Sequence, residues 1–371
     1  MKKWMNIIFC LIFLLSLIFP FTATDFRKNQ ASEIDNEYLP ELDNVLLEEM
    51  PSAVENYFNK RIGFRMEALD LYQKINDRIF GLLEHPTYMY GSDGHVFFKS
   101  SRFVSRYQHL DLNQEEANRF AEALAGFQQY AESRGKRFMY WLLPNKETVY
   151  PEYYPKSINV LGDISYIDQL LSALEEHQVN HLYGKDAMVN AKEFMLVNNV
   201  KYDAGHWNEN GAFVSCQNFY SAIQDWYPGV KPLVLEDYTV NMAVVKSLDT
   251  SHFEIHEEVP CYNLIESHAE NQTEAFRSKA YLSFSDNYAY HYVNPTCQDQ
   301  PSILFFSDSY LGSNMKFFTE HFSETTFIHR YNCLNQEAFE YYVDLVNPDI
   351  VIFENPERSL PIDLYQDFIK P

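Results

Sequence analysis

The chain is organised around the segment Lys201–Phe213, which has the sequence KYDAGHWNENGAF. It places the carboxylate of Asp203 three residues before the imidazole of His206, and Asn208 then stands where a helix is expected to begin. A carboxylate that orients a histidine supplies two of the three groups of a nucleophilic catalytic triad. The alternative is that these residues only cap the helix and fill space. The remaining question is whether the chain offers a nucleophile.

A second segment, Ser302–Ser313 with the sequence SILFFSDSYLGS, places a serine directly after a predicted strand. We expect a helix near residues 309–321, so Ser309 would lie at the carboxyl end of a buried strand and at the start of a helix. N–H groups of a first helical turn point toward such a position. We therefore predict that Ser309 is the nucleophile and that these N–H groups stabilise an oxyanion. The alternative is that Asp308 or Ser309 only caps the helix.

Around these segments, predicted helices and strands alternate in the manner of an α/β layered domain with a mostly parallel sheet. Predicted helices span residues 113–134, 163–177, 186–195, 210–226 and 336–346, and predicted strands span residues 137–143, 179–183, 302–306, 325–329 and 349–353. Residues 229–300 break this alternation, because Pro232–Val245 and Tyr281–Val293 alternate like strands around a polar stretch. We interpret them as an inserted β segment over one edge of the sheet.

The N-terminus predicts export from the cytoplasm. Lys2 and Lys3 precede an uncharged apolar run from Ile7 to Phe21. Lysines before such a run keep the N-terminus in the cytoplasm and place the remainder outside. We favour an uncleaved membrane anchor over residues 1–24, and a cleaved signal peptide that yields a secreted protein is the alternative.

The regions outside the central domain have less distinctive patterns. Residues 25–84 predict a polar stalk followed by one or two amphipathic helices between about Met50 and Leu83. Tyr88–Phe98 predicts two short strands around a Ser-Asp-Gly turn. We place the α/β domain at residues 85–360 and a C-terminal tail at residues 361–371.

Composition excludes several classes of partner. The formal net charge of −23 argues against nucleic acid and against an anionic membrane surface as the main partner. The sequence has no Gly-rich phosphate loop, dinucleotide fingerprint or metal-ligand cluster, so we expect no cofactor and no metal. Four of the five cysteines lie outside the apolar run and are either isolated thiols or form a disulfide, with Cys261–Cys297 as the first candidate.

Several segments together carry a resemblance to a known family: YGSDGHVF at residues 90–97, LPNKETVYPE at 143–152, the segment 203–212, SDSY at 307–310, NPDIVIFE at 347–354 and ER at 357–358. Over roughly residues 85–360 the chain resembles the SGNH-hydrolase-like domain of the alginate O-acetyltransferase group, which comprises the AlgJ and AlgX proteins and the related DHHW proteins of bacterial envelopes. The order Asp203, His206, Ser309 is similar to the permuted order of that group. Two features depart from it: two residues rather than one separate Asp203 from His206, and Ser307 stands where the group has glycine.

The resemblance implies an extracytoplasmic O-acyltransferase that O-acetylates a cell-envelope or secreted polysaccharide through an acyl-serine intermediate. It also implies a membrane-bound O-acyltransferase as the source of the acyl group. The residues expected to contact substrate are Arg330, Tyr310, Lys146 and Trp207. For three of these an alternative role is open: a surface ion pair for Arg330, packing for Lys146, and packing beside the His206 imidazole or in the core for Trp207. At the level of function, the alternatives are an SGNH-type carbohydrate esterase and a non-catalytic envelope protein.

Overall fold

The computed structural model describes residues 2–28, 39–43, 45–83, 85, 87–248, 253–282, 284 and 288–360. The chain divides into two compact units, one of residues 1–84 with 250–253 and the other of residues 85–249 with 254–371. The predicted C-terminal tail at residues 361–371 lies outside the described residues, as does much of the predicted stalk.

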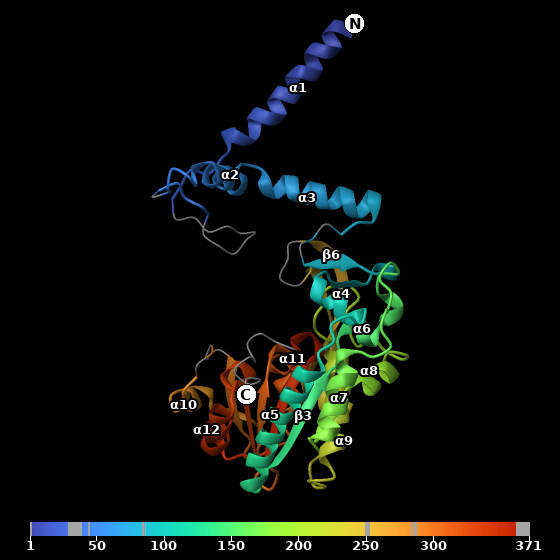
Figure 1. Cartoon of the computed structure of the whole chain (residues 1–371), viewed down its shortest axis with the longest axis vertical. Helices are drawn as coiled ribbons and strands as arrows, with labels where there is room; N and C mark the ends of the chain where they lie inside the picture. The colour runs from blue at the N-terminus through green and yellow to red at the C-terminus, as the bar shows by residue number, and fades with distance from the viewer. Residues whose placement is uncertain are drawn as a thin grey trace. The chain divides into compact units, whose positions relative to one another are not determined.

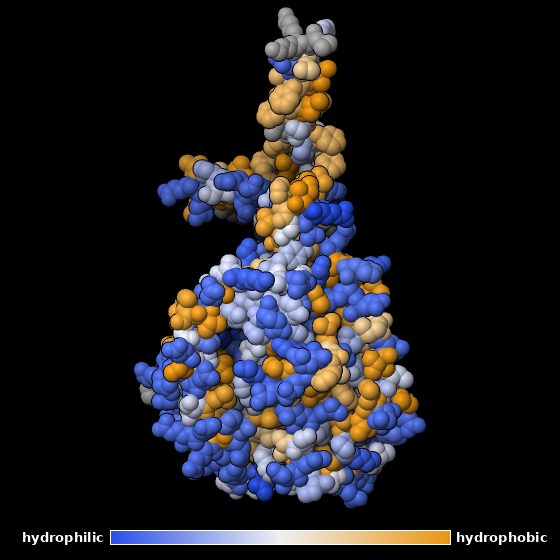
Figure 2. Space-filling view, turned by 90° about the vertical axis from the view of Figure 1, so that its right-hand side faces the viewer, coloured by the Kyte–Doolittle hydropathy of each residue, from blue (hydrophilic) through white to orange (hydrophobic). Residues whose placement is uncertain are grey.

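The first unit contains an apolar helix and two further helices. Helix α1 (Lys2–Thr22) includes a stretch of 19 residues, Trp4–Thr22, with a hydropathy of 2.3. By length and composition it could cross a membrane, a test that signal sequences also pass. Apolar side chains dominate the surface of this helix in Figure 2. Helices α2 (Met50–Arg61) and α3 (Arg65–Ile75), with a π-helical turn at Asn76–Phe80, confirm the helices predicted between residues 50 and 83.

The second unit is built on a seven-stranded sheet (Figure 1). In spatial order its strands are β4 (His181–Tyr183), β3 (Arg137–Leu143), β11 (Ile350–Pro356), β9 (Ile303–Ser307), β10 (Glu324–His329), β8 (Ala289–Val293) and β7 (Glu270–Asn271). The first five strands run parallel, whereas β8 and β7 pair antiparallel at one edge. Strands β9 and β11 are buried along their whole length, which explains their nearly continuous apolar sequences.

Helices cover both faces of this sheet (Figure 1). They are α5 (Gln114–Ser133), α7 (Tyr166–Glu176) and α12 (Gln336–Val346) on one face and α9 (Glu209–Ile223) on the other. Because side chains alternate along a strand, Tyr140 of β3 packs in the α5 layer and its neighbour Trp141 packs in the α9 layer. The fold is therefore three-layered, and the predicted α/β class with a mostly parallel sheet is confirmed.

Local signals fixed most of the predicted boundaries. Asn113 caps α5 by accepting the N–H of Glu116, and Ser165 forms a capping box at the start of α7. Shorter helices are α4 (Ser101–Tyr107), α6 (Lys146–Val149), α8 (Lys185–Ala191) and α10 (Thr273–Arg277). Strands β1 (Tyr88–Tyr90) and β2 (Val96–Phe98) pair around a turn at Ser92–Gly94, as predicted.

The predicted insertion at residues 229–300 consists of two separate structures. Strands β5 (Tyr238–Ser247) and β6 (Glu254–Leu264) form an antiparallel hairpin, whereas β7 and β8 extend the main sheet. The prediction of a polar connection over the residues of β6 is wrong. Exposed and half-buried residues alternate along its first half because one face of the hairpin packs on the domain and the other meets solvent. Pro260 is tolerated in this strand because, among the strands that the structure describes, β6 pairs with β5 alone.

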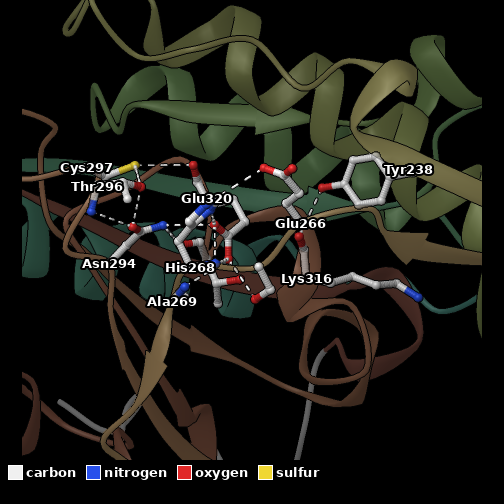
Figure 3. A network of polar contacts seen from close by, with 11 residues as sticks. Tyr238, Glu266, His268, Ala269, Asn294, Thr296, Cys297, Lys316 and Glu320 are labelled. Atoms are coloured by element: carbon white, nitrogen blue, oxygen red, sulfur yellow. Dashed lines mark hydrogen bonds and ion pairs between the residues drawn. The ribbon is translucent and has the colours of Figure 1, made fainter.

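A half-buried carboxylate, Glu320, fixes the chain that follows the hairpin (Figure 3). Glu320 accepts hydrogen bonds from the backbone N–H groups of His268 and Ala269, the hydroxyl of Ser267 and the amide of Asn294. Burial alone would raise the pKa of Glu320, but these hydrogen bonds outweigh it and lower that pKa. The network ties the end of the hairpin segment to the edge of the main sheet.

All five cysteines are free, so the candidate disulfide Cys261–Cys297 does not form. Cys216, Cys297 and Cys333 are buried in the domain and behave as small apolar side chains.

Candidate active site

The sheet brings four polar residues to one edge. Strands β9, β11, β3 and β10 are parallel and neighbouring, so their carboxyl ends lie together. Ser309 follows β9, Arg358 follows β11, Asn145 follows β3 and Arg330 follows β10. Clefts of open α/β sheets form at this edge. The nucleophile predicted from the sequence therefore lies where the fold places its sites.

The three residues predicted as a triad are in hydrogen-bond contact. His206 Nδ1 lies 2.7 Å from Asp203 Oδ2, and His206 Nε2 lies 2.8 Å from Ser309 Oγ. The other oxygen of Asp203 accepts the backbone N–H groups of Gly205 and His206 at 2.7 and 3.0 Å. With two intervening residues, Asp203 can thus hold both the backbone and the ring of His206. Asn208 caps the next helix through the N–H of Gly211, as predicted.

The carboxyl group of Asp203 is ionised in the folded protein. Burial would raise its pKa, but the hydrogen bond and charge of His206, with the two backbone N–H groups, lower the pKa of Asp203 to about 2. A negative charge therefore faces the Nδ1 side of the imidazole at neutral pH.

Arg358 determines which nitrogen of His206 carries the proton. Its Nη2 lies 2.9 Å from His206 Nε2. An arginine only donates hydrogen bonds, so Nε2 must be the acceptor and Nδ1 must hold the proton that is donated to Asp203. The Ser309 hydroxyl can then donate to the same Nε2 atom. This is the tautomer that a general base needs to remove a proton from serine.

Sequence analysis assigned no role to Arg358. Its backbone N–H donates to Asn145 Oδ1 at 2.9 Å, and its guanidinium carbon lies 4.7 Å from the centre of the Tyr310 ring. The available signal was positional, because Arg358 follows a strand of the parallel sheet at its carboxyl end.

The turn that carries Ser309 differs in part from the prediction. Helix α11 (Ser309–Gly312) is a single turn, so the helix predicted over residues 309–321 is wrong. Asp308, not Ser309, is the cap, and its side chain accepts the N–H of Tyr310 at 2.8 Å. The N–H of Asp308 donates to Glu354 at 3.1 Å. Neither of these two N–H groups is available to an oxyanion.

The helix stops because side chains bind the carbonyl group that would extend it. Asn314 Nδ2 and Trp207 Nε1 both donate to the carbonyl oxygen of Tyr310, at 2.8 and 3.2 Å. The N–H of Asn314 bonds to Leu311 instead, which tightens the chain. The ring of Tyr310 lies 5.0 Å from the His206 imidazole, and Trp207 packs against Tyr310. Tyr310, and not Trp207, therefore packs beside the His206 imidazole.

Arg330 forms a buried ion pair, rather than the predicted substrate contact or surface pair. Its guanidinium lies 2.5 Å from Asp308 Oδ2 and donates to Ser359 Oγ at 2.7 Å, and the residue is only 2% exposed. Burial would raise the pKa of Asp308, but the charges of Arg330 and Arg358 lower it. Arg330 thereby stabilises the charged cap that precedes Ser309. Burial, reinforced by the charge of Asp308, raises the pKa of Glu354 far above its usual range.

Lys146 also lies in the interior and does not line a cavity with Ser309. Its Nζ donates to the carbonyl oxygens of Val96 at 2.8 Å and Val200 at 2.9 Å. It is 1% exposed, and burial lowers its pKa to about 7. The predicted substrate contact is therefore wrong. Lys146 ties β2 to the chain that leads to Asp203, which matches the packing alternative.

The hairpin holds the same chain segment from the other end. Glu257 of β6 accepts the backbone N–H groups of Val200, Lys201 and Tyr202 at 2.6, 2.8 and 2.7 Å. Three consecutive donors on one carboxylate fix the loop immediately before Asp203. No local pattern in the sequence signalled this contact.

We expect Glu257→Ala to destabilise the folded protein by about 1–3 kcal/mol, because it leaves three partly buried N–H groups without their acceptor. The loop that carries Asp203 and His206 should also become more mobile. Thermal unfolding and hydrogen exchange of residues 200–206 measure the two effects. Glu258→Ala, which changes the next and exposed residue of the strand, is the matched control. Equal stability of the two variants would contradict the prediction.

His206 lines one cavity, and its hydrogen-bond partner Arg358 lines another. The first, about 480 Å³, is lined by Asn199, Tyr202, Asp203, His206, Trp207, Asn208, Glu209, Ala243, Val245, Val259, Pro260, Cys261, Ser309, Tyr310, Ser313 and Asn314. The hairpin therefore supplies an apolar wall opposite Ser309. The second, about 520 Å³, is lined by Thr87, Phe98, Lys99, Ser100, Arg102, Phe103, Tyr331, Arg358 and Ser359. Arg358 connects the two, because it lines the second cavity and contacts His206 of the first.

Gly205 permits this arrangement because a side chain there would meet Arg358. A Cβ atom at this position would lie 2.3 Å from Arg358 Nη1 and 2.5 Å from the ring of Phe98.

We expect Gly205→Ala to displace the guanidinium from His206 and to destabilise the fold by about 1–3 kcal/mol. Thermal unfolding, together with the chemical shifts of the His206 ring, measures both effects. Gly229→Ala is the control, since nothing lies within 4 Å of a Cβ there. An unchanged His206 spectrum in Gly205→Ala would contradict the prediction.

Comparison with solved structures shows the fold. PatB1 from Bacillus cereus, solved with a sulfonyl adduct, matches with a TM-score of 0.54 at 15% identity, over 75% of this chain and 96% of that one. A DHHW family protein from Eubacterium siraeum matches with a TM-score of 0.53 at 15% identity, over 78% and 96%. This chain has the fold of a DHHW family protein.

The remaining comparisons add little to this result. The O-acetyltransferase domain of AlgJ from Pseudomonas putida has a TM-score of 0.46 at 14% identity, over 75% of this chain and 93% of that one. No protein-family model and no curated protein sequence matches the chain. Within the part of the chain that the structure describes, no group of three or more His, Cys, Asp or Glu residues could hold a metal ion.

Proposed function

We propose that this protein is an extracytoplasmic O-acyltransferase that O-acetylates a cell-envelope or secreted polysaccharide through an acyl-serine intermediate. The observation that carries the proposal is the continuous chain of hydrogen bonds from Asp203 through His206 to Ser309, with Nδ1 protonated and Nε2 as the acceptor that faces the Ser309 hydroxyl. The resemblance of the motif segments to the alginate O-acetyltransferase group supports acetyl transfer as the reaction. The apolar helix α1 supports a location outside the cytoplasm, at the membrane.

In the first half-reaction, His206 Nε2 takes the proton of Ser309 as Oγ attacks the carbonyl carbon of the acyl donor. The charge of Asp203 stabilises the imidazolium that forms. The donors for the oxyanion are the guanidinium of Arg358 and the backbone N–H of Ser309, which has no acceptor within the helix because Ser309 is the first residue of α11. His206 then returns its proton to the leaving group, and an acetyl ester remains on Ser309.

In the second half-reaction, a sugar hydroxyl attacks the acetyl-serine while His206 removes its proton. The ester oxygen of Ser309 leaves and regains its proton from the imidazolium. We propose a membrane-bound O-acyltransferase as the source of the acyl group, because α1 would hold this domain at the bilayer where such a donor works. Water in place of the sugar would give a carbohydrate esterase.

The test is to incubate the full chain in nonionic detergent with p-nitrophenyl acetate and to locate acetyl groups by mass spectrometry of peptides. We expect one acetyl group on Ser309 and none in Ser309→Ala. Ser313→Ala is the matched control, because Ser313 lines the same cavity but does not contact His206. Acetyl-serine at another position, or no adduct at all, would reject the proposal. Adding an oligosaccharide and analysing whether it or free acetate carries the label separates transfer from hydrolysis.

A further inference from the structure

The cavity of about 520 Å³ that Arg358 lines, which we call the basic cavity, has an unusual charge. Its lining residues are Thr87, Phe98, Lys99, Ser100, Arg102, Phe103, Tyr331, Arg358 and Ser359. Three of these nine residues are cationic and none is acidic. The whole chain carries 52 acidic against 29 basic residues. The lining of this cavity is therefore positively charged, whereas the protein as a whole is negatively charged.

Among the described residues, no carboxylate forms an ion pair with a cation of the basic cavity, although the charge of Arg358 helps to lower the pKa of Asp308. Within the described ranges, no carboxylate oxygen lies within 4 Å of a side-chain nitrogen of Lys99, Arg102 or Arg358. Asp111, which lies close in sequence to Arg102, pairs with the buried Arg106 at 3.2 Å instead. Lys99 and Arg102 are exposed at the cavity, so an incoming anion can reach them. Unpaired cations that share a concave surface concentrate positive potential there.

The basic cavity is joined to the candidate nucleophile through one side chain. Arg358 lines the cavity, and its Nη2 lies 2.9 Å from His206 Nε2, which is itself 2.8 Å from Ser309 Oγ. A guanidinium presents several donors in a planar fork and can bind an anion while it keeps a second contact. An acidic group held in the cavity would thus leave the adjoining part of the same molecule beside Ser309.

The remaining walls of the cavity suit a ring-shaped, partly polar ligand. Phe98 and Phe103 are stacked with ring centres 5.0 Å apart, and Tyr331 contributes another aromatic ring. Ser100 and Ser359 also line the cavity and carry hydroxyl groups that exchange hydrogen bonds. Apolar walls with a few placed polar groups are the usual composition of small-molecule sites, and this volume lies within their range.

We propose that the basic cavity binds the acidic group, a carboxylate or a phosphate, of the glycan that accepts the acyl group. That the bound glycan accepts the acyl group rests on the proposed function. That the cavity binds an anion rests on the cavity alone. Lys99 and Arg102 hold the acidic group at the outer side, and Arg358 holds it next to the nucleophile. The acceptor is thereby an acidic rather than a neutral polysaccharide.

The test measures binding without chemistry, on the full-length Ser309→Ala protein in nonionic detergent. The probes are an oligogalacturonate for the carboxylate, an oligo(glycerol phosphate) for the phosphate, and a neutral malto-oligosaccharide of matched length, each followed by isothermal titration calorimetry. We expect one of the acidic probes to bind, the neutral one to bind at least tenfold more weakly, and added salt to reduce the difference. Adding the substitutions Lys99→Ala and Arg102→Ala to this protein should lower its affinity for the acidic probe by about tenfold.

The matched control removes two exposed lysines elsewhere, with Lys156→Ala and Lys279→Ala, and should bind as Ser309→Ala does. Equal binding of acidic and neutral probes, or equal losses in the two double variants, would overturn the proposal. Acetylation of Ser309 by p-nitrophenyl acetate tests the function separately. Charge-dependent binding without acetylation would retain the anion site and reject its role in acyl transfer. Acetylation without charge-dependent binding would retain the enzyme and reject the acidic acceptor.

Discussion

Replacing His206 with alanine is expected to lower the rate of acetylation of Ser309 by about 10⁴-fold or more, the scale on which loss of a triad base acts. The reason is local: His206 Nε2 is the acceptor at 2.8 Å from Ser309 Oγ, and without it the serine must lose its proton to water. The variant also leaves the ionised Asp203 without the ring that it binds. The measurement is the release of p-nitrophenol in a single turnover.

His256→Ala provides the matched control, since His256 is an exposed histidine on strand β6 and should leave the rate unchanged. Thermal unfolding of both variants separates loss of chemistry from loss of structure. If His206→Ala acetylates Ser309 within tenfold of the wild-type rate, the hydrogen-bond chain is not the source of reactivity. The proposed function would then fail while the fold remains.

The three central residues of the site could be predicted because each is marked by a local pattern. Ser309 follows an apolar strand without a linker, and His206 precedes a helix cap, Asn208, that fixes where its loop ends. Parallel strands place their carboxyl ends at one edge, so predicting the strands was nearly enough to locate the serine. That the loop of His206 reaches the same edge came from the resemblance, because spacing alone cannot bring residues 203 and 309 together.

The residues that sequence analysis missed act through contacts distant in the chain. Glu257 reaches the loop before Asp203 only because the hairpin pairs in one register, and that hairpin was not predicted. Arg330 was given a substrate role because it follows the strand after the Ser309 turn, and Lys146 because it lies in one of the segments that carry the resemblance. Their burial depends on the carboxylate of Asp308 and on two backbone carbonyl groups, respectively, which no local pattern reveals.

Asp203→Asn is the second substitution with a large expected effect, a loss of about 10³- to 10⁴-fold in the acetylation rate. The asparagine can keep its oxygen on the N–H groups of Gly205 and His206, so its NH₂ group must face His206 Nδ1. Nδ1 then has to accept, the proton moves to Nε2, and Nε2 meets the donors of Arg358 and Ser309 instead of accepting from them. Single-turnover kinetics measure the loss, with the exposed Asp225→Asn as a charge-matched control.

The same substitution should change how stability depends on pH, with a sign that follows from the lowered pKa. The pKa of Asp203 falls from 3.8 to about 2 on folding, so its ionisation contributes about 2 kcal/mol of stability above pH 4. That contribution is lost as the pH falls toward 2, because the unfolded chain takes up the proton first. The stability difference between wild type and Asp203→Asn should therefore shrink between pH 5 and pH 2, measured by denaturant unfolding. A difference that stays constant over this range would mean that the carboxylate does not bind the imidazole as the structure places it, and the tautomer argument would fall with it.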